Sequence, residues 1–234
     1  ILDLEKIANS LRKERMLKGA LSFDKVEVHF DLNSKNEPTG IKLKESKESN
    51  KLVEEYMLLA NRKVAEFIIK KPARPFVYRV HDAPDEQKLE NLKQTVNSFG
   101  YSFNPFEKEI SKEINGLLQA CKGKREQNLI DTLALRCMSK AIYTTQNIGH
   151  YGLAFSYYTH FTSPIRRYPD ILVHRLLHTY LGEGATESVP IIEEACEHSS
   201  YKEQLATKAE RDSIKHMQMV FMQDKVGQDF DGLI

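Results

Sequence analysis

The chain has 234 residues, of which 41% are hydrophobic and 29% are charged, as in a globular protein with a packed core. Its net charge of +1 excludes a polycation, so a nucleic-acid partner would have to be met by a local basic patch. The apolar runs are too short for a membrane-spanning helix, which needs about 20 residues. Cys121, Cys137 and Cys196 show no metal-binding spacing and predict reduced thiols in a cytoplasmic protein.

The first part of the chain predicts a helix, a hairpin and a second helix. Residues 4–17 carry apolar side chains at helical spacing. Residues 26–32 and 41–45 alternate apolar and polar side chains on either side of a turn signal, which predicts a β-hairpin. From residue 47 to residue 70 the apolar spacing is helical again.

The middle of the chain predicts an extended segment and three helices. The extended segment, 72–80, is punctuated by prolines. Helical patterns follow over 82–100, 106–122 and about 125–142, and the first two stop at glycines.

Two further helices close the chain, one from Pro164 to Leu181 and a long charged one from about 189 to 225. The pattern as a whole predicts a mainly α-helical α+β domain, in which helices pack around a small antiparallel sheet.

The stretch THFTSPIRRYPD, residues 159–170, combines a helix start with two arginines. Thr162 or Ser163 is expected as N-cap, with Pro164 at the first helical position. Arg166 and Arg167 would then lie in the first turn, where the helix dipole disfavours cations. A bound phosphate would explain them, because helix N–H groups bind anions and guanidinium groups grip phosphate oxygens in pairs.

A simpler interpretation is that Arg166 pairs with Asp170, four residues on, as a weak surface ion pair. Taken alone, the stretch favours this interpretation. Consecutive helical residues also point about 100° apart, so both arginines cannot easily face one phosphate.

The neighbouring residues change this balance. HYGLAFSYYTHFTSPIRRYPDILVHRLL, 150–177, resembles the signature of the ribonuclease II/ribonuclease R (RNB) family of exoribonucleases. Four further elements are similar to family motifs and follow in the same order: RMLKGALSFDKVEV (15–28), LVEEYMLLANRKVA (52–65), YRVHDAPD (78–85) and KAERDS (208–213). The resemblance covers essentially the whole chain.

The resemblance implies a 3′–5′ exoribonuclease that hydrolyses single-stranded RNA to nucleoside 5′-monophosphates with a divalent metal, usually Mg²⁺. Arg166 matches the arginine that contacts the scissile phosphate, where it would stabilise the transition state. Arg167 is then structural or contacts a neighbouring phosphate. Glu210 matches an acidic residue near the 3′-terminal nucleotide.

Three further residues are weaker candidates for RNA contacts. Tyr168 is the aromatic residue that we expect to face the site, because single-stranded RNA stacks on rings beside basic groups. One of Glu54 and Glu55 is expected to face a polar pocket, and the sequence does not decide which. Solvent exposure of both glutamates is the competing interpretation.

No metal ligands are expected in this chain. The resemblance implies that the family's aspartate cluster would precede Ile1, so residues 1–225 would be a catalytic domain without its metal-binding part. Residues 226–234 would begin a truncated OB-fold domain. His150, His160 and His174 fit no usual zinc spacing, and hydrogen-bonded structural roles are expected for them and for His81.

We therefore expect the isolated chain to have little or no nuclease activity. The alternative function is a non-catalytic scaffold of the same family that binds RNA or a protein. An incomplete domain would expose apolar surface, so self-association is a further expectation.

Overall fold

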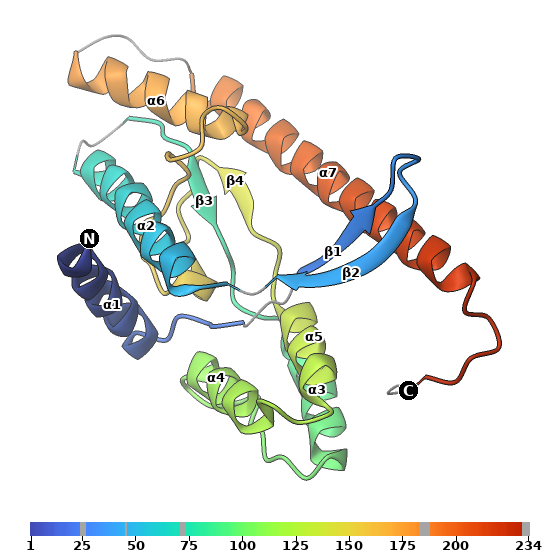
Figure 1. The fold of residues 1–234 in the computed structure, drawn as a ribbon. Helices are drawn as coiled ribbons and strands as arrows, with labels where there is room; N and C mark the ends of the chain where they lie inside the picture. The colour runs from blue at the N-terminus through green and yellow to red at the C-terminus, as the bar shows by residue number, and fades with distance from the viewer. Residues whose placement is uncertain (24–26, 45, 71–73, 183–187, 231–234) are drawn as a thin grey trace.

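The computed structural model describes residues 1–23, 27–44, 46–70, 74–182 and 188–230. The described chain is mainly helical, with two two-stranded antiparallel sheets (Figure 1). Its elements are α1 (Leu2–Leu17), β1 (Glu27–Leu32), β2 (Pro38–Lys44), α2 (Glu48–Ile69), β3 (Tyr78–Val80), α3 (Glu86–Ser98), α4 (Ile110–Cys121), α5 (Gln127–Cys137), β4 (Ile142–Thr144), the 3₁₀ turn η1 (Tyr151–Leu153), α6 (Tyr168–Leu181) and α7 (Val189–Gln223).

The main core surrounds the sheet formed by β3 and β4, in which Arg79 lies opposite Tyr143. Helices α2, α6 and α7 contribute apolar side chains to one buried cluster with this sheet, including Ile68, Val173 and Ile192. The predicted fold class, helices around a small antiparallel sheet, is confirmed. The core sheet is β3–β4, however, and the predicted hairpin lies outside this cluster.

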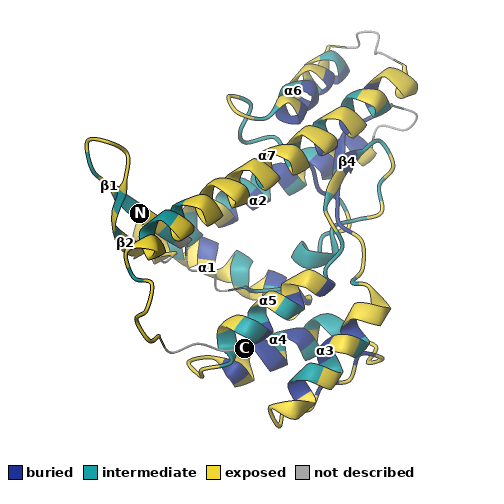
Figure 2. Cartoon of the chain, turned by 90° about the vertical axis from the view of Figure 1, so that its right-hand side faces the viewer, coloured by how far each residue is buried: buried dark blue, intermediate teal, exposed yellow. Residues whose placement is uncertain are grey.

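Helices α3, α4 and α5 form a second buried cluster of their own, centred on residues such as Leu92, Ile114 and Ile130. Figure 2 shows buried residues in these three helices and, apart from them, around β4 and α6. Asn115 of α4 donates to the carbonyl of Ala20 and accepts from the N–H of Ser22, so the segment that follows α1 is held against this second cluster.

The predicted hairpin is β1–β2, and its register places apolar side chains on one face. Val28 lies opposite Leu43, and Phe30 lies opposite Ile41. The Phe30 ring contacts Phe221 near the end of α7, with ring centroids 6.2 Å apart. The long last helix therefore extends from the core to the hairpin (Figure 1).

One predicted helix is too long. The pattern over 125–142 predicts a single helix, but α5 ends at Cys137 and residues 142–144 form β4. The apolar spacing of Leu135, Met138 and Ile142 continues the helical pattern, so periodicity alone cannot detect the change. Pairing with β3 determines the outcome, because β4 fills the edge of the core sheet.

The predicted helix at Pro164 begins four residues later. Residues 164–166 form a turn, Arg167 is the extended N-cap, and α6 starts at Tyr168. The reason is Pro169, which has no N–H to donate to the carbonyl four residues earlier and whose ring would clash with it. Neither Thr162 nor Ser163 is therefore the N-cap. Helix α3 likewise starts late, at Glu86, with Asp85 as N-cap.

Two further predictions are an OB-fold strand at residues 226–234 and the lack of a membrane-spanning helix. Residues 226–230 form a turn and irregular backbone, and residues 231–234 of the expected OB-fold strand lie outside the described residues. Among the described helices, none has both the length and the apolar character that crossing a membrane would require.

Helices α1 and α2 are joined by a buried ion pair. A guanidinium nitrogen (Nη2) of Arg15 lies 2.5 Å from Oε1 of Glu55, and the two side chains are only 7% and 3% exposed. The same nitrogen lies 3.7 Å from Glu54, whose side chain is 51% exposed. The Glu55 side chain thus holds α1 against α2, while the Glu54 side chain remains accessible to solvent.

Replacing Glu55 by glutamine should lower the free energy of unfolding by about 3 kcal/mol, because it leaves the buried Arg15 charge with only the longer contact to Glu54. Urea denaturation would measure this loss. The matched change Glu54→Gln should cost less than about 1 kcal/mol, as for exposed ion pairs. Equal effects of the two changes would contradict the assignment of Glu55 as the buried partner.

Candidate functional site

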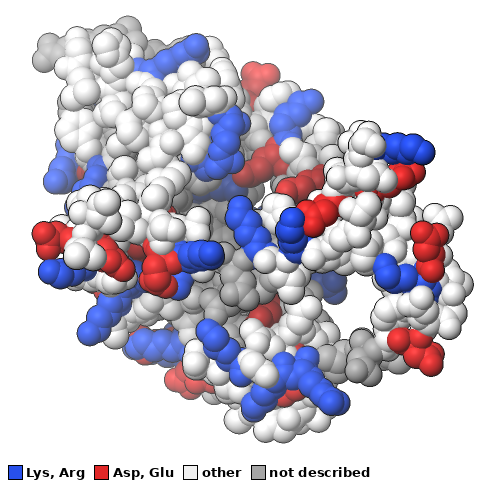
Figure 3. Space-filling model, in the orientation of Figure 1, with Lys and Arg blue, Asp and Glu red and all other residues white. Residues whose placement is uncertain are grey.

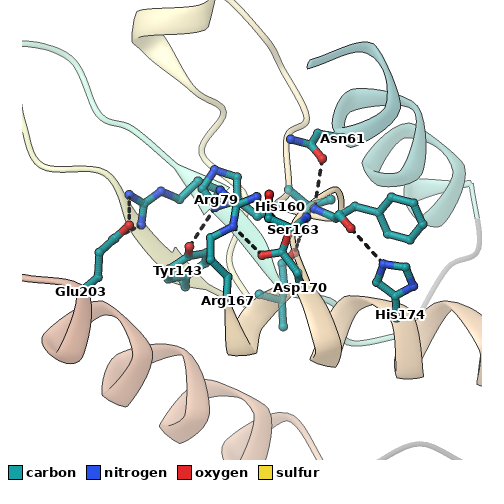
Figure 4. A network of polar contacts seen from close by, with 12 residues as sticks. Asn61, Arg79, Tyr143, His160, Ser163, Arg167, Asp170, His174 and Glu203 are labelled. Atoms are coloured by element: carbon teal, nitrogen blue, oxygen red, sulfur yellow. Dashed lines mark hydrogen bonds and ion pairs between the residues drawn. The ribbon is translucent and has the colours of Figure 1, made fainter. Parts of the chain in front are cut away.

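The segment that carries the two arginines, residues 159–167, is held in shape by contacts from four elements (Figure 4). Thr159 donates its hydroxyl hydrogen to the carbonyl of Val77, beside β3, over 2.7 Å. At Phe161, the backbone N–H donates to Asn61 of α2 and the carbonyl accepts from His174 of α6. The His174 ring also stacks on Phe161, with centroids 4.0 Å apart. We call residues 159–167 the arginine loop.

Asp170, in the first turn of α6, fixes the end of this loop. Its carboxylate is fully buried and accepts the backbone N–H of Ser163 over 2.8 Å. Both oxygens of this carboxylate also pair with the Arg167 guanidinium, with Nη2–Oδ1 and Nε–Oδ2 distances of 2.9 Å. A buried carboxylate is stable only when paired and hydrogen-bonded, and Asp170 meets this requirement through the loop that it holds.

The two arginines therefore have opposite environments. Arg167 turns inward onto Asp170, whereas Arg166 is exposed, and within the described part of the chain its side chain has no ion-pair partner. The simpler interpretation, an ion pair between Arg166 and Asp170, is wrong. The late start of α6 places Arg167 at the N-cap, three residues before Asp170, so Arg167 is the residue that pairs.

A half-buried histidine of the arginine loop, His160, ties the loop to the core strand β4. Nδ1 of His160 lies 2.8 Å from the Tyr143 hydroxyl, on the core strand β4. Burial lowers the pKa of His160 to about 2, and the positive charges of Arg167 and Arg79 act in the same direction. A neutral His160 is therefore part of the structural framework, because it does not charge at neutral pH.

The other histidines have similar environments. His81 donates from Nε2 to the carbonyl of Ser139 and accepts the N–H of Gly152 at Nδ1, which fixes its tautomer. Burial, with His81 close by, lowers the pKa of His150 to about 3. These arrangements agree with the structural roles expected for His81, His160 and His174.

The long helix α7 is linked to the same framework. The two terminal guanidinium nitrogens of Arg79, Nη1 and Nη2, donate to the carboxylate of Glu203 in α7, over 2.7 and 3.1 Å. The Arg79 guanidinium also lies over the Tyr143 ring, 4.5 Å from its centroid. Figure 4 shows Glu203, Arg79, Tyr143 and the arginine loop as one connected set of contacts.

Glu210 lies seven residues beyond Glu203, almost two full turns, and so points from nearly the same face of α7. Its side chain is exposed, as is that of Tyr168, which is 52% exposed at the start of α6. Both predicted residues are therefore free to meet a ligand.

Glu54 lines a groove of about 520 Å³ between α2 and the arginine loop. The groove is also lined by Met57, Asn61, Thr162 and Arg167. The structure thus brings Glu54 and Arg167 to one groove, whereas Glu55 does not line this groove and is held in the buried ion pair with Arg15.

The surface charge is mixed, not uniformly basic. Figure 3 shows Lys and Arg interspersed with Asp and Glu over the visible face. Among the described residues there is also no group of three or more His, Cys, Asp or Glu side chains that could hold a metal ion. The residues described here therefore do not fit a resident Mg²⁺ site.

Sequence reasoning missed several residues that shape the site. The position of Asp170 three residues after Arg167 is a detectable signal, since i and i+3 side chains adjoin on a helix. Asn61 belongs to the Ala-Asn element already noted, but its contact with the loop is 100 residues distant in sequence. Arg79 and Glu203 carry no local signal, because they are 124 residues apart.

Comparison with known proteins gives a consistent result. The model of the RNB domain matches residues 1–183. Ribonuclease R of Aquifex aeolicus (strain VF5) is 36% identical over 234 residues, covering 99% of this chain and 33% of that protein. The chain thus spans about a third of the length of this relative.

Solved structures share the fold at low sequence identity. Mycoplasma genitalium RNase R in complex with ribose-methylated single-stranded RNA matches with a TM-score of 0.86 and 24% identity, over 96% of this chain and 36% of that chain. Yeast Ssd1, a pseudonuclease, matches with a TM-score of 0.63 and 23% identity, over 86% of this chain and 25% of that chain.

Acidification should reveal the buried neutral state of His160. Above its ordinary pKa of 6.5 the histidine contributes no pH dependence. Below pH 6.5, His160 binds a proton in the unfolded chain but not in the folded chain. This group therefore lowers the free energy of unfolding by about 1.4 kcal/mol for each pH unit of acidification. In His160→Gln, unfolding free energies measured between pH 6.5 and 4 should fall less steeply. The same change at the exposed His178 should leave the slope as it is, and an unchanged slope in His160→Gln would refute the assignment.

Proposed function

Because the chain belongs to the RNB family, we propose that it is part of a 3′–5′ exoribonuclease and binds single-stranded RNA at the arginine loop. The whole enzyme would release nucleoside 5′-monophosphates with the help of Mg²⁺. The three cysteines are unpaired thiols, which fits a reducing compartment such as the cytoplasm.

The observation that carries this proposal is the unbalanced charge of Arg166. Three arginines lie near His160, and two of them are neutralised, Arg79 by Glu203 and Arg167 by Asp170. Arg166 alone of the three is left with a free guanidinium, held on a loop of fixed shape. A phosphate is the ligand that such a group suits best, because its oxygens accept the paired N–H donors of the guanidinium.

The remaining candidates have roles consistent with this arrangement. Glu210 would contact the ribose of the 3′-terminal nucleotide, since ribose hydroxyls distinguish RNA from DNA. Tyr168 would offer a ring for base stacking beside the arginines. Glu54 would contact RNA in the groove that it lines, and Arg167 would act by shaping the loop that presents Arg166.

Metal-dependent hydrolysis requires carboxylates that hold the ion. Among the described residues, no three His, Cys, Asp or Glu side chains form such a group. The isolated chain would thus supply the phosphate contact and the 3′-end contacts but not the metal.

A non-catalytic scaffold that binds RNA or a protein is the second candidate. The structural similarity to Ssd1 favours it, because a protein described as a pseudonuclease shares this fold. Self-association through exposed apolar side chains, such as Leu43 on the hairpin, would fit either candidate.

Arg166→Ala should weaken binding of a labelled single-stranded RNA about tenfold or more, because one charge-assisted contact is lost. The slope of log affinity against log salt concentration should also become shallower by about one. Fluorescence anisotropy across a salt series would measure both quantities.

The matched control for this experiment is Arg175→Ala, at an exposed arginine on α6 with no ion pair in the described structure. It should leave affinity and salt slope close to those of the unmodified chain. Equal affinities for Arg166→Ala and the unmodified chain would remove the basis of the phosphate contact.

The purified chain should bind RNA but degrade it little, if at all, in the presence of Mg²⁺. The physical reason is the missing carboxylate group among the described residues. Gel analysis of a 5′-labelled RNA, with and without EDTA, would test this. Robust shortening that EDTA abolishes would show that the chain holds a catalytic metal after all.

A further inference from the structure

Helix α7 is attached to the core through polar contacts on one stripe of its first half. The Glu193 carboxylate accepts from the Thr145 N–H and from the Thr144 hydroxyl. Ser200 accepts the Tyr143 N–H over 2.9 Å. Glu203 follows on the same stripe and receives the two donors of Arg79.

Beyond this point α7 has little support. In the described part of the chain, the side chains of residues 205–216 make no hydrogen bond or ion pair with another element, and most of them are exposed. Gln204 accepts one exposed hydrogen bond from Lys140, and near the end of α7 the Phe221 ring contacts Phe30 of the hairpin. The half-buried Glu203 is therefore the last strong anchor before Glu210.

The other end of this anchor reaches the arginine loop. The Arg79 N–H donates to the carbonyl of Tyr158, directly before the loop. Its guanidinium lies over Tyr143, whose hydroxyl bonds His160 of the loop. Arg79 thus contacts the residue directly before the arginine loop, the tyrosine that bonds His160 of the loop, and the helix that carries Glu210.

We propose that the Arg79–Glu203 ion pair is a positioning strut that sets the separation between the arginine loop and the part of α7 that carries Glu210. Both residues are positioning residues, since neither is free to touch RNA itself. The inference rests on the proposed function for its importance to RNA binding, but the strut is a property of the chain without RNA.

The chemistry of the pair suits this role. The guanidinium fork holds the carboxylate through two parallel bonds, which fixes orientation as well as distance. The Arg79 side chain is only 12% exposed, so its position is defined by the strand and ring around it. Lysine could keep the charge but neither the fork nor the stacking on Tyr143.

The direct test measures distance. The native cysteines are buried, so spin labels can be attached selectively at Ile165→Cys on the loop and Asp212→Cys on α7, both exposed positions. Pulsed electron paramagnetic resonance without RNA then gives the distribution of distances between the labels. Glu203→Gln and Arg79→Lys should each broaden or shift this distribution. The matched change Glu197→Gln, at an exposed residue of the same helix, should not.

A second readout asks whether the strut acts through Glu210. Glu203→Gln should weaken RNA binding about three- to tenfold, the effect of one lost hydrogen-bonded contact. Adding Glu210→Gln to that variant should then have almost no further effect, although Glu210→Gln alone weakens binding. A general loss of structure would not produce this dependence.

Each outcome separates the strut from the proposed function. An unchanged distance distribution in both Glu203→Gln and Arg79→Lys overturns the strut. Fully additive losses of affinity overturn the route through Glu210. A changed distribution in a chain that binds no RNA supports the strut and overturns the proposed function instead.

Discussion

The candidate site depends on one buried carboxylate. Asp170 cannot remain charged in the interior without partners, and it finds them in the Ser163 N–H and the Arg167 guanidinium. Satisfying Asp170 folds the arginine loop back over the start of α6. Arg166 then remains on the outside of that turn. The exposure of one arginine is thus a consequence of the burial of its neighbour.

The same logic of paired charges extends to the helix that faces the loop. Arg79 and Glu203 neutralise each other between β3 and α7, and the Tyr143 ring lies against the guanidinium. The neutral His160 joins this set without adding charge. Of the three arginines near His160, Arg79 and Arg167 are each paired with a carboxylate, and Arg166 is the one left exposed without an ion pair among the described residues, which is the basis of the proposed phosphate contact.

The sequence predicted most helices and the hairpin because their apolar residues repeat at regular spacing. It also predicted the arginine loop as the functional segment, because THFTSPIRRYPD is part of a long and specific family signature. It misplaced the start of α6 because the capping signal at Ser163 and Pro164 outweighed Pro169, which prevents a helix from beginning there. It missed β4 because three apolar residues at helical spacing extend into it.

The sequence by itself therefore determined the fold class and the family, since both are recorded in local patterns and motif order. Only the tertiary structure decided which arginine is free, which of Glu54 and Glu55 is accessible, and how α7 is held beside the loop. The reason is that these outcomes depend on partners distant in sequence. Arg15 meets Glu55 across 40 residues and Arg79 meets Glu203 across 124, and no local pattern encodes such pairs.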